Sequence, residues 1–366
     1  MTQSRIRAVY MRGGTSRCLV FHERDLPPAG VERDYILLAA LGSPDPYGRQ
    51  LDGLGGGISS LSKACIIGPT THPGADVDYT FAQVEVGKAH VDYTGNCGNC
   101  SSAVGPFAIE ERLIQPVDGL TQVRIHNTNT KKLIVARVPV AGSEPAVHGD
   151  FELPGVAGTG ARIALDFVEP GGAGTGQLLP TGKPRDVVDG LEASLVDASI
   201  PMIFVRARDL GLTGTETPQA VDGDKALSAR LEKIRVAASH LMGIAGSAAT
   251  PKIAMVTAPT EYTALDGSRV TREQADVVAR AISMGNCHRA FPLTSSMCLA
   301  VAARIEGTLV HEVSTAAASA DVRLGHPSGV LPLDAVVTAQ GGEYTAERVT
   351  VYRTARRLME GWVRIP

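Results

Sequence analysis

Aromatic side chains are scarce in this sequence of 366 residues, where they make up 4%. Charge of one sign is scarce as well, because the formal net charge is −3 and the sequence contains no basic run and no acidic tail. Stacking on nucleobases requires aromatic rings, and binding to nucleic acid or an anionic membrane requires a basic patch. Nucleic acid and membranes are therefore not expected as the main partners.

Long apolar runs are also missing. No run approaches the ~18 residues of a membrane-spanning helix, and the first residues lack the apolar segment of a signal peptide. We therefore expect a cytoplasmic protein. The six cysteines are few for this length, so in a reducing compartment they are expected to be free thiols rather than a disulfide framework.

Glycine, by contrast, is abundant at 40 residues and separates short apolar segments. Both halves mix strand-like alternation with helical spacing, so the expected class is α+β, and the length favours two domains. The glycine-rich stretch 155–182 predicts the passage between domains at 1–182 and 183–366, the last strand being a candidate to return to the first domain. The triplet GNC occurs at 95–97 and 285–287, each time ahead of a small-residue helix, which suggests a duplicated architecture. Helices are expected over 33–42, 101–113, 224–243, 272–284 and 294–305, and strands at 6–11, 18–22, 64–68, 77–86, 88–93, 122–128, 132–140, 193–207, 252–259, 308–313, 320–324, 330–338 and 346–353.

Cys97 and Cys100 form a C-x-x-C pair within the segment GNCGNC. A structural zinc site needs four ligands, and the sequence has neither a second such pair nor a histidine pair at zinc-binding spacing. A thioredoxin-like dithiol belongs to a βαβ unit, whereas the strands flanking this pair have antiparallel character. Two other interpretations carry more weight: cysteines that only pack at a helix start, or a single functional thiol at Cys97.

Cys97 directly precedes the expected helix start, where unpaired N–H groups and the helix dipole favour a thiolate with a low pKa. The backbone N–H groups of Gly98, Asn99 and Cys100 can hold a carboxylate. The side chains of Asn96 and Asn99 add amide donors. The pattern predicts a thiol that exchanges protons beside a bound carboxylate.

Lys63 ends the segment GGGISSLSK and immediately precedes an apolar strand. A lone lysine is usually a solvated surface group. At this junction, however, partial burial would lower the pKa of the ammonium group and let Lys63 act as a base. The hydroxyls of Ser59 and Ser60, just before it, are candidates to bind a substrate.

Arg12, Thr15 and Ser16 belong to the segment RGGTSR, in which arginine and hydroxyl groups lie beside glycines. This combination suits carboxylates or phosphate. The segment differs from the phosphate loop of nucleotide-binding proteins, and the nearby GLGGG lacks the strand–glycine–helix order of a dinucleotide fold. Nucleotide binding is therefore not expected.

In the second half, the segments GNCHRAFPLTSS and GHPSG stand out. Their candidates are His288, Thr294, Ser295 and Ser328. These are either a structural histidine and ordinary helix caps, or side chains that bind a second carboxylate. Ser328 does not lie in a G-x-S-x-G motif, so hydrolase chemistry has little support.

The motifs RGGTS, GSPDPYGRQLDG and GNCGN occur together in the first third of the chain, and this run resembles the PrpF family. That family includes 2-methylaconitate cis-trans isomerase and 4-oxalomesaconate isomerase, and the resemblance continues more loosely through GNCHRAFPLTSS, LGHPSG and RTARRLM. It implies a diaminopimelate-epimerase-like fold. In that fold, two similar domains each wrap a curved sheet around a central helix, with the active site in the cleft between them.

The resemblance also implies proton transfer across an allylic system without a cofactor or metal. The family's lysine after the serine-rich loop falls on Lys63, and its motif cysteine falls on Cys97. The sequence departs from the family at Arg17, where lysine is common, and Cys100 lies outside the core motif. The helix start of the second half offers hydroxyl groups in place of a second thiol, which disfavours a two-thiol epimerase.

We therefore expect an isomerase that shifts a double bond of an unsaturated tricarboxylate by a 1,3-proton transfer. Lys63 is the expected base and Cys97 the expected acid, with the reverse assignment left open. The residues expected to hold one end of the substrate are Arg12, Thr15, Ser16, Ser59, Ser60, Asn96, Gly98 and Asn99, and those expected to hold the other are His288, Thr294, Ser295 and Ser328.

The expected substrate is 4-oxalomesaconate, from aromatic-acid catabolism, because the chain is somewhat short for the propionate-pathway enzymes. The alternative is 2-methylaconitate or aconitate. An amino-acid epimerase and an accessory protein without enzymatic activity are less favoured. No cofactor or metal is expected, and assembly as a homodimer is left open.

Overall fold

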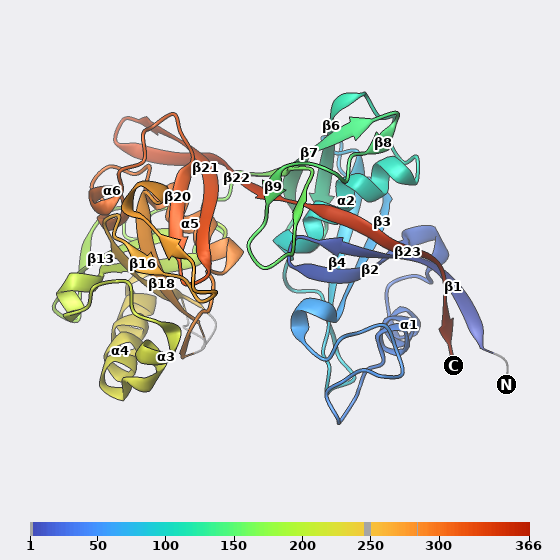
Figure 1. The fold of residues 1–366 in the computed structure, drawn as a ribbon, viewed down its shortest axis with the longest axis horizontal. Coiled ribbons are helices and arrows are strands. Elements are labelled where there is room, and N and C mark those ends of the chain that lie inside the picture. The colour runs from blue at the N-terminus through green and yellow to red at the C-terminus, as the bar shows by residue number, and fades with distance from the viewer. Residues whose placement is uncertain (1–2, 245–249, 284) are drawn as a thin grey trace. The chain divides into compact units, whose positions relative to one another are not determined.

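The computed structural model describes residues 3–244, 250–283 and 285–366. The chain divides into two units, each with its own strands and helices (Figure 1). The first unit contains the chain up to Phe167 together with Tyr352–Pro366, and the second contains Val168–Val351. The sequence analysis placed this division between residues 182 and 183, whereas in the structure it lies earlier in the same glycine-rich stretch.

In the first unit, eight strands form a sheet in the order β23-β1-β2-β3-β4-β6-β7-β11. The sheet curves around α2 (Gly98–Glu110), which packs against β1, β2, β3, β4, β6, β7 and β23. The helix is buried from Cys100 to Ile109, because its own residues there are small or apolar around its whole circumference. The strand bounds are β1 Ser4–Gly13, β2 Ser16–His22, β3 Lys63–Pro69, β4 Val77–Val84, β5 Val91–Asp92, β6 Gly119–Asn127, β7 Lys132–Ala141, β8 Glu144–Pro145, β9 Phe151–Glu152, β10 Thr159–Gly160, β11 Ile163–Val168 and β23 Ala355–Ile365.

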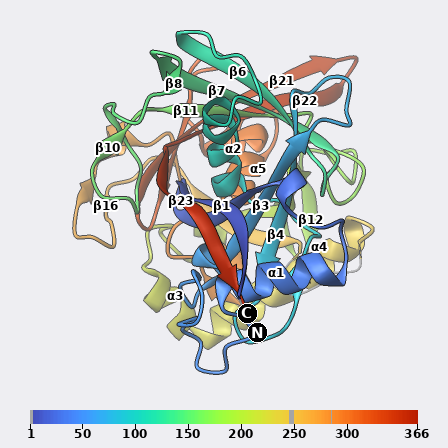
Figure 2. The same ribbon diagram turned by 90° about the vertical axis from the view of Figure 1, so that its right-hand side faces the viewer.

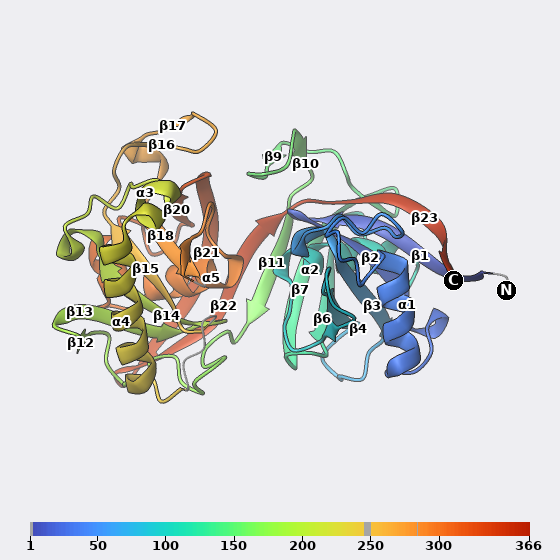
Figure 3. The same ribbon diagram turned by 90° about the horizontal axis from the view of Figure 1, so that it is seen from below.

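The helix α1 (Val31–Leu41) packs against β4, β5 and β23, and strands β3 and β4 separate it from α2 (Figures 2 and 3). Its apolar side includes Leu37 and Leu41, which join a buried cluster with Phe21. Burial of each such side chain stabilises the fold by about 1.5–3 kcal/mol. The helix ends at Gly42, whose φ of 76° is the left-handed conformation that glycine adopts without strain.

In the second unit, eight strands form a sheet in the order β12-β13-β14-β15-β18-β20-β21-β22. The buried helix α5 (Leu293–Ala302) packs against β13, β14 and β21. The helix α4 (Lys225–Leu241) packs against β12 and β15 and lies beside α3 (Pro218–Gly223). The strand bounds are β12 Asp186–Val188, β13 Leu191–Asp197, β14 Pro201–Arg206, β15 Lys252–Thr257, β16 Tyr262–Thr263, β17 Arg269–Val270, β18 Val277–Ser283, β19 Asn286–Cys287, β20 Val322–His326, β21 Gly329–Gln340 and β22 Glu343–Arg353.

The two sheets have the same pairing pattern. From β23 to β11, and again from β12 to β22, successive neighbours pair antiparallel, antiparallel, parallel, antiparallel, parallel, antiparallel and antiparallel. The helices α1 and α4 occupy equivalent places in the chain order, and so do α2 and α5. The expected α+β class, with two similar curved sheets each enclosing a central helix, is confirmed.

Two expected elements are wrong. The helix predicted over 272–284 is a short 3-10 turn, η4 (Arg272–Gln274), followed by strand β18, and the strand predicted at 308–313 is the helix α6 (Leu309–Val313). Strand β18 pairs with both β15 and β20 and is almost entirely buried, so it lacks the alternation that marks a half-exposed strand. Residue 284 lies outside the described residues. Among the described helices, none is both long and apolar enough to cross a membrane.

Candidate functional site

The turn between β1 and β2 lies against the start of α2. A Cβ atom on Gly13 would lie 2.6 Å from the carbonyl oxygen of Asn99, and one on Gly14, at φ 53°, would lie 2.3 Å from Asn99 Oδ1. Both positions therefore need glycine to let the turn approach the helix. Thr15 Oγ1 accepts a hydrogen bond of 3.0 Å from Asn99 Nδ2. Two of the motifs singled out in the sequence thus form one contact.

Cys97 is the N-cap residue of α2. Its Sγ accepts a hydrogen bond of 3.5 Å from the backbone N–H of Cys100. The helix begins at Gly98, three residues before the expected start at 101, so the predicted anion-binding residues Gly98 and Asn99 form its first turn. The first N–H groups of a helix have no partner within the helix, which makes this end suitable for a carboxylate.

Lys63 is the first residue of β3 and is only 8% exposed. Its Nζ donates a hydrogen bond of 2.5 Å to Gln83 Oε1 and lies 4.9 Å from the centroid of the Phe81 ring. Gln83 stands directly opposite on β4, and its Nε2 donates to the carbonyl oxygens of Ser59, at 3.1 Å, and Ser62, at 2.9 Å. Gln83 therefore holds Lys63 and the serine-rich loop together. The sequence analysis missed it, although strand pairing of the two neighbouring segments would have pointed to it.

The pKa of the Cys97 thiol differs from the expectation, because it is raised and not lowered. Its side-chain contact with Cys100 and its burial raise the pKa of Cys97 well above the ordinary value, while the charge of Lys63 acts in the opposite direction. The expected low pKa is wrong, because a neighbouring thiol and burial outweigh the helix N-terminus and the lysine. Cys97 is consequently a neutral thiol at pH 7, a form suited to donating a proton.

Arg353, the last residue of β22 and the first of the segment RTARRLM, contacts the start of α2, although no role was predicted for it. It is 5% exposed, its Nε donates a hydrogen bond of 2.9 Å to Asn99 Oδ1, and its Nη1 donates one of 2.7 Å to the carbonyl oxygen of Tyr352. Burial lowers the pKa of Arg353 to about 10, whereas the charge of a Cys97 thiolate would raise it. The side chain therefore remains a cation at neutral pH and adds positive charge beside the thiol.

The other predicted residues of the first unit have structural contacts. Arg12 Nη1 donates hydrogen bonds of 2.9 Å to the carbonyl oxygens of both Gly14 and Thr354. Asn96 Oδ1 accepts from Ser101 Oγ at 3.3 Å and from Asn127 Nδ2 at 3.4 Å. Ser16 is buried at the start of β2, Ser59 is exposed, and Ser60 is half-buried within the 3-10 turn η2 (Ser59–Leu61).

In the second unit, α5 begins at Leu293, so Thr294 and Ser295 lie inside its first turn and not at the capping position, which is Pro292. Ser295 is fully buried, and within the described part of the chain its Oγ has no hydrogen-bond partner. The hydroxyl of Ser328 donates 2.6 Å to the carbonyl oxygen of Arg289, which joins the HPSG turn to the segment of His288. His288 is exposed, and its Nδ1 accepts from the backbone N–H of Ala290 at 3.2 Å.

Known proteins resemble this chain along its whole length. A family model described as PrpF protein matches residues 3–366. The crystal structure of a methylitaconate-delta-isomerase superposes with a TM-score of 0.92 at 43% sequence identity, covering 100% of this chain and 96% of that one. A 2-methyl-aconitate isomerase of Shewanella oneidensis is 41% identical, over 100% of this chain and 98% of that protein. A 4-oxalomesaconate tautomerase of Pseudomonas putida is 38% identical, over 99% and 97%.

The duplicated α+β fold and these likenesses define the class of the protein, which is an isomerase. The family model described as PrpF protein matches almost the entire chain and defines the class more closely. The chain belongs to the PrpF family.

Proposed function

We propose that the protein shifts a carbon–carbon double bond in an unsaturated polycarboxylate by moving a proton across the allylic system. The observation that carries this proposal is the placement of a buried lysine at the start of β3 and a thiol at the N-cap of α2, a helix that packs against β3. The names of the relatives, which specify isomerisation of methylitaconate, methylaconitate and oxalomesaconate, support the reaction type.

In the proposed reaction, Lys63 in its neutral form removes a proton from the carbon next to a carboxylate. The thiol of Cys97 delivers its proton to the other end of the allylic unit, because its raised pKa keeps it protonated until that step. The ammonium group of Lys63 then returns a proton to the Cys97 thiolate, which restores the starting state. The assignment of Lys63 as base and Cys97 as acid is thus the better supported of the two.

Negative charge spreads onto the substrate carboxylate as the proton leaves. The N–H groups of Gly98 and Asn99 and the guanidinium of Arg353 are fixed before the reaction, so they can stabilise this charge without rearranging. We propose that Thr15 and the loop of Ser59 assist in holding the same carboxylate. Further substrate contacts remain predictions for Arg12, Ser16, Ser60, Asn96, His288, Thr294, Ser295 and Ser328.

The substrate is proposed as a class, unsaturated polycarboxylates with an acidic allylic C–H. The prediction of 4-oxalomesaconate, and with it a role in aromatic-acid catabolism, stands beside 2-methylaconitate as the alternative. The relatives named for oxalomesaconate and methylaconitate are similarly identical to this chain, at 38% and 41%. Identity alone therefore does not rank these two substrates.

Incubation with oxalomesaconate, methylaconitate, methylitaconate and aconitate in deuterated water tests the proposal, with deuterium uptake followed by NMR. We expect uptake at the allylic carbons of at least one substrate, and a loss of about 10²–10⁴-fold in rate for Lys63→Met and for Cys97→Ser. Lys88→Met, which removes a lysine that is 78% exposed, is the matched control and should retain full activity. Two outcomes would contradict the proposal. One is absence of deuterium uptake with every substrate, and the other is uptake that survives both Lys63→Met and Cys97→Ser.

A further inference from the structure

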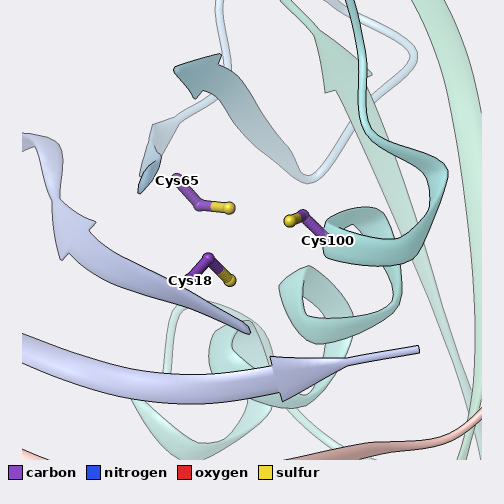
Figure 4. A group of neighbouring side chains, drawn as sticks. All are labelled: Cys18, Cys65 and Cys100. Atoms are coloured by element: carbon purple, nitrogen blue, oxygen red, sulfur yellow. The ribbon is translucent and has the colours of Figure 1, made fainter. Parts of the chain in front are cut away.

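Three buried thiols meet beside the proposed site without a part in the proposed reaction. The Sγ atoms of Cys18, Cys65 and Cys100 all lie within 4.8 Å of one another, and each residue is at most 1% exposed. Figure 4 shows the three sulfur atoms facing a common centre from two strands and a helix.

The positions of the three sulfurs are fixed by regular structure. Strands β2 and β3 pair in parallel with Val20 opposite Cys65, so Cys18, two residues before Val20, projects from the same face of the sheet. Cys100 lies in the first turn of α2, which packs against both strands. Ligands held on strands and helices in this way need little reorganisation to bind a metal ion.

Cys97 supplies a fourth sulfur next to this cluster, because its Sγ already contacts the backbone N–H of Cys100 at 3.5 Å. The C-x-x-C pair alone supplies two of the four ligands of a zinc site and lacks the other half. The fold supplies that half through Cys18 and Cys65, which no local spacing could reveal. Four thiolates arranged tetrahedrally at ~2.3 Å are a common coordination shell of zinc, which requires sulfur–sulfur distances of about 3.8 Å. For Cys18, Cys65 and Cys100 this is a modest contraction, whereas Cys97, which lies outside their 4.8 Å group, must turn its side chain toward them.

We propose that Cys18, Cys65, Cys97 and Cys100 bind one thiophilic divalent cation of the Zn²⁺ or Cd²⁺ type. Binding replaces the protons that the thiols hold with four metal–sulfur bonds, which releases up to four protons and leaves a site charge of −2. Two cationic side chains, Lys63 and Arg353, can balance this charge, because each interacts electrostatically with Cys97. Lys63 also projects from the same face of β3 as Cys65, two residues earlier.

One consequence rests on the proposed function. A cation bound by Cys97 removes the proton that this thiol would deliver to the substrate, so the metal-bound protein should be inactive. Activity should return when a chelator removes the cation. Metal binding itself is measured without substrate, so its failure and a failure of the isomerase reaction are separate results.

Titration of the reduced, chelator-treated full-length protein with Cd²⁺ tests the site. We expect one Cd²⁺ per chain, a thiolate-to-metal charge-transfer band in the ultraviolet, and release of protons from the thiols as the cation binds. Cys65→Ala and Cys100→Ala should each weaken Cd²⁺ binding by roughly 10- to 100-fold or more. Loss of a ligand should cost at least as much affinity as loss of a residue that hydrogen-bonds to a ligand. Cys298→Ala is the matched control, because Cys298 is equally buried, lies in α5 of the second unit, and donates to the carbonyl oxygen of Val196 at 3.4 Å.

A measurement on the unaltered protein keeps the test independent of how well the variants fold. X-ray absorption of the Zn²⁺-loaded chain should show a shell of four sulfur atoms at ~2.3 Å. Absence of stoichiometric binding, a shell dominated by nitrogen or oxygen, or a charge-transfer band that persists in the Cys18→Ala/Cys65→Ala double variant would overturn the proposal.

Discussion

At the scale of single residues, Gln83 is the hydrogen-bond partner of the proposed base Lys63. Gln83 offers Lys63 Nζ a neutral oxygen at 2.5 Å, and the Phe81 ring covers the same group. A carboxylate at that position would instead hold the lysine as an ammonium ion, which cannot accept a proton. The proposed base therefore depends on the absence of a negative charge from its nearest neighbour.

The substitution Gln83→Glu tests this dependence, since it changes the charge with almost no change in shape. We expect the pH–rate profile to move to higher pH, because an adjacent carboxylate favours the ammonium form of a lysine. Activity at pH 7 should fall accordingly and recover partly in alkaline buffer. Gln122→Glu, on the exposed side of β6, serves as the control. An unshifted profile would show that position 83 has only a structural role.

Local sequence was sufficient to predict some of these residues and not others. Lys63 and Cys97 stand at the ends of short motifs whose neighbours mark a strand start and a helix start. Gln83 and Arg353 become visible only when strand register and the return of the C-terminal segment are known. The pKa of Cys97 was predicted in the wrong direction because Cys100, as a neighbouring thiol, outweighs the helix N-terminus.

At the scale of elements, an equivalent aspartate–arginine ion pair occurs in each of the two sheets. In the first unit, Asp76 accepts hydrogen bonds from the backbone N–H, Nε and Nη2 of Arg124, and in the second, Asp276 accepts the same three from Arg323. Each aspartate precedes the strand that pairs in parallel with the strand of its arginine. The pair therefore fixes the register of equivalent parallel strands in both units.

The pH dependence of stability should reveal this pair. Burial acts to raise the pKa of Asp276, but the hydrogen bonds and charge of Arg323 outweigh it and bring the pKa below the ordinary value. Because the folded-state pKa is depressed, the pair stabilises the protein above the unfolded pKa of ~3.9 and loses this effect as the pH falls further.

The variant Asp276→Asn should consequently lower the free energy of unfolding by about 1.5–3 kcal/mol at pH 7. The difference from the unaltered protein should shrink steadily below about pH 4, where the native aspartate becomes protonated too. Thermal unfolding between pH 7 and pH 3 measures the difference, with the exposed Asp150→Asn as control. A difference that does not depend on pH would contradict this account.

Most elements could be predicted from alternation, helical spacing and glycine positions, as for α1, α4 and the hairpin of β1 and β2. The failure at 272–284 has a physical cause. Val277 and Val278 begin a strand that is buried between two others, and a continuously buried strand has the same apolar run as a buried helix. The pairing pattern common to both sheets was inaccessible, because it depends on contacts between distant segments.

At the scale of the whole molecule, the two units differ in how the chain builds them. The second unit is one continuous segment, Val168–Val351, with its own buried cluster around Leu195, Ile203 and Leu231. The first unit is discontinuous, because its sheet is completed by β23. All ten residues of β1 pair with that last strand, and Arg357 on it contacts both Glu110 and Glu111.

Separate expression of the segments should reflect this difference. We expect the fragment 168–351 to unfold cooperatively on heating, as followed by circular dichroism, because its sheet and core are complete. The fragment 1–167 should show no cooperative transition, since β1 keeps β2 but lacks its other partner, β23. Joining 352–366 to it through a flexible linker should restore the transition. Equal cooperative unfolding of 1–167 with and without the added segment would contradict the expectation.

The position of β23 also has a consequence for synthesis on the ribosome. The first unit is made first, yet it remains incomplete until β23 (Ala355–Ile365) has left the exit tunnel, while the second unit can fold before it. During that interval the edge of β1 is unpaired and offers its backbone to other chains. Newly made molecules of this protein should therefore be most prone to aggregate, and most dependent on chaperones, in the interval before β23 has emerged.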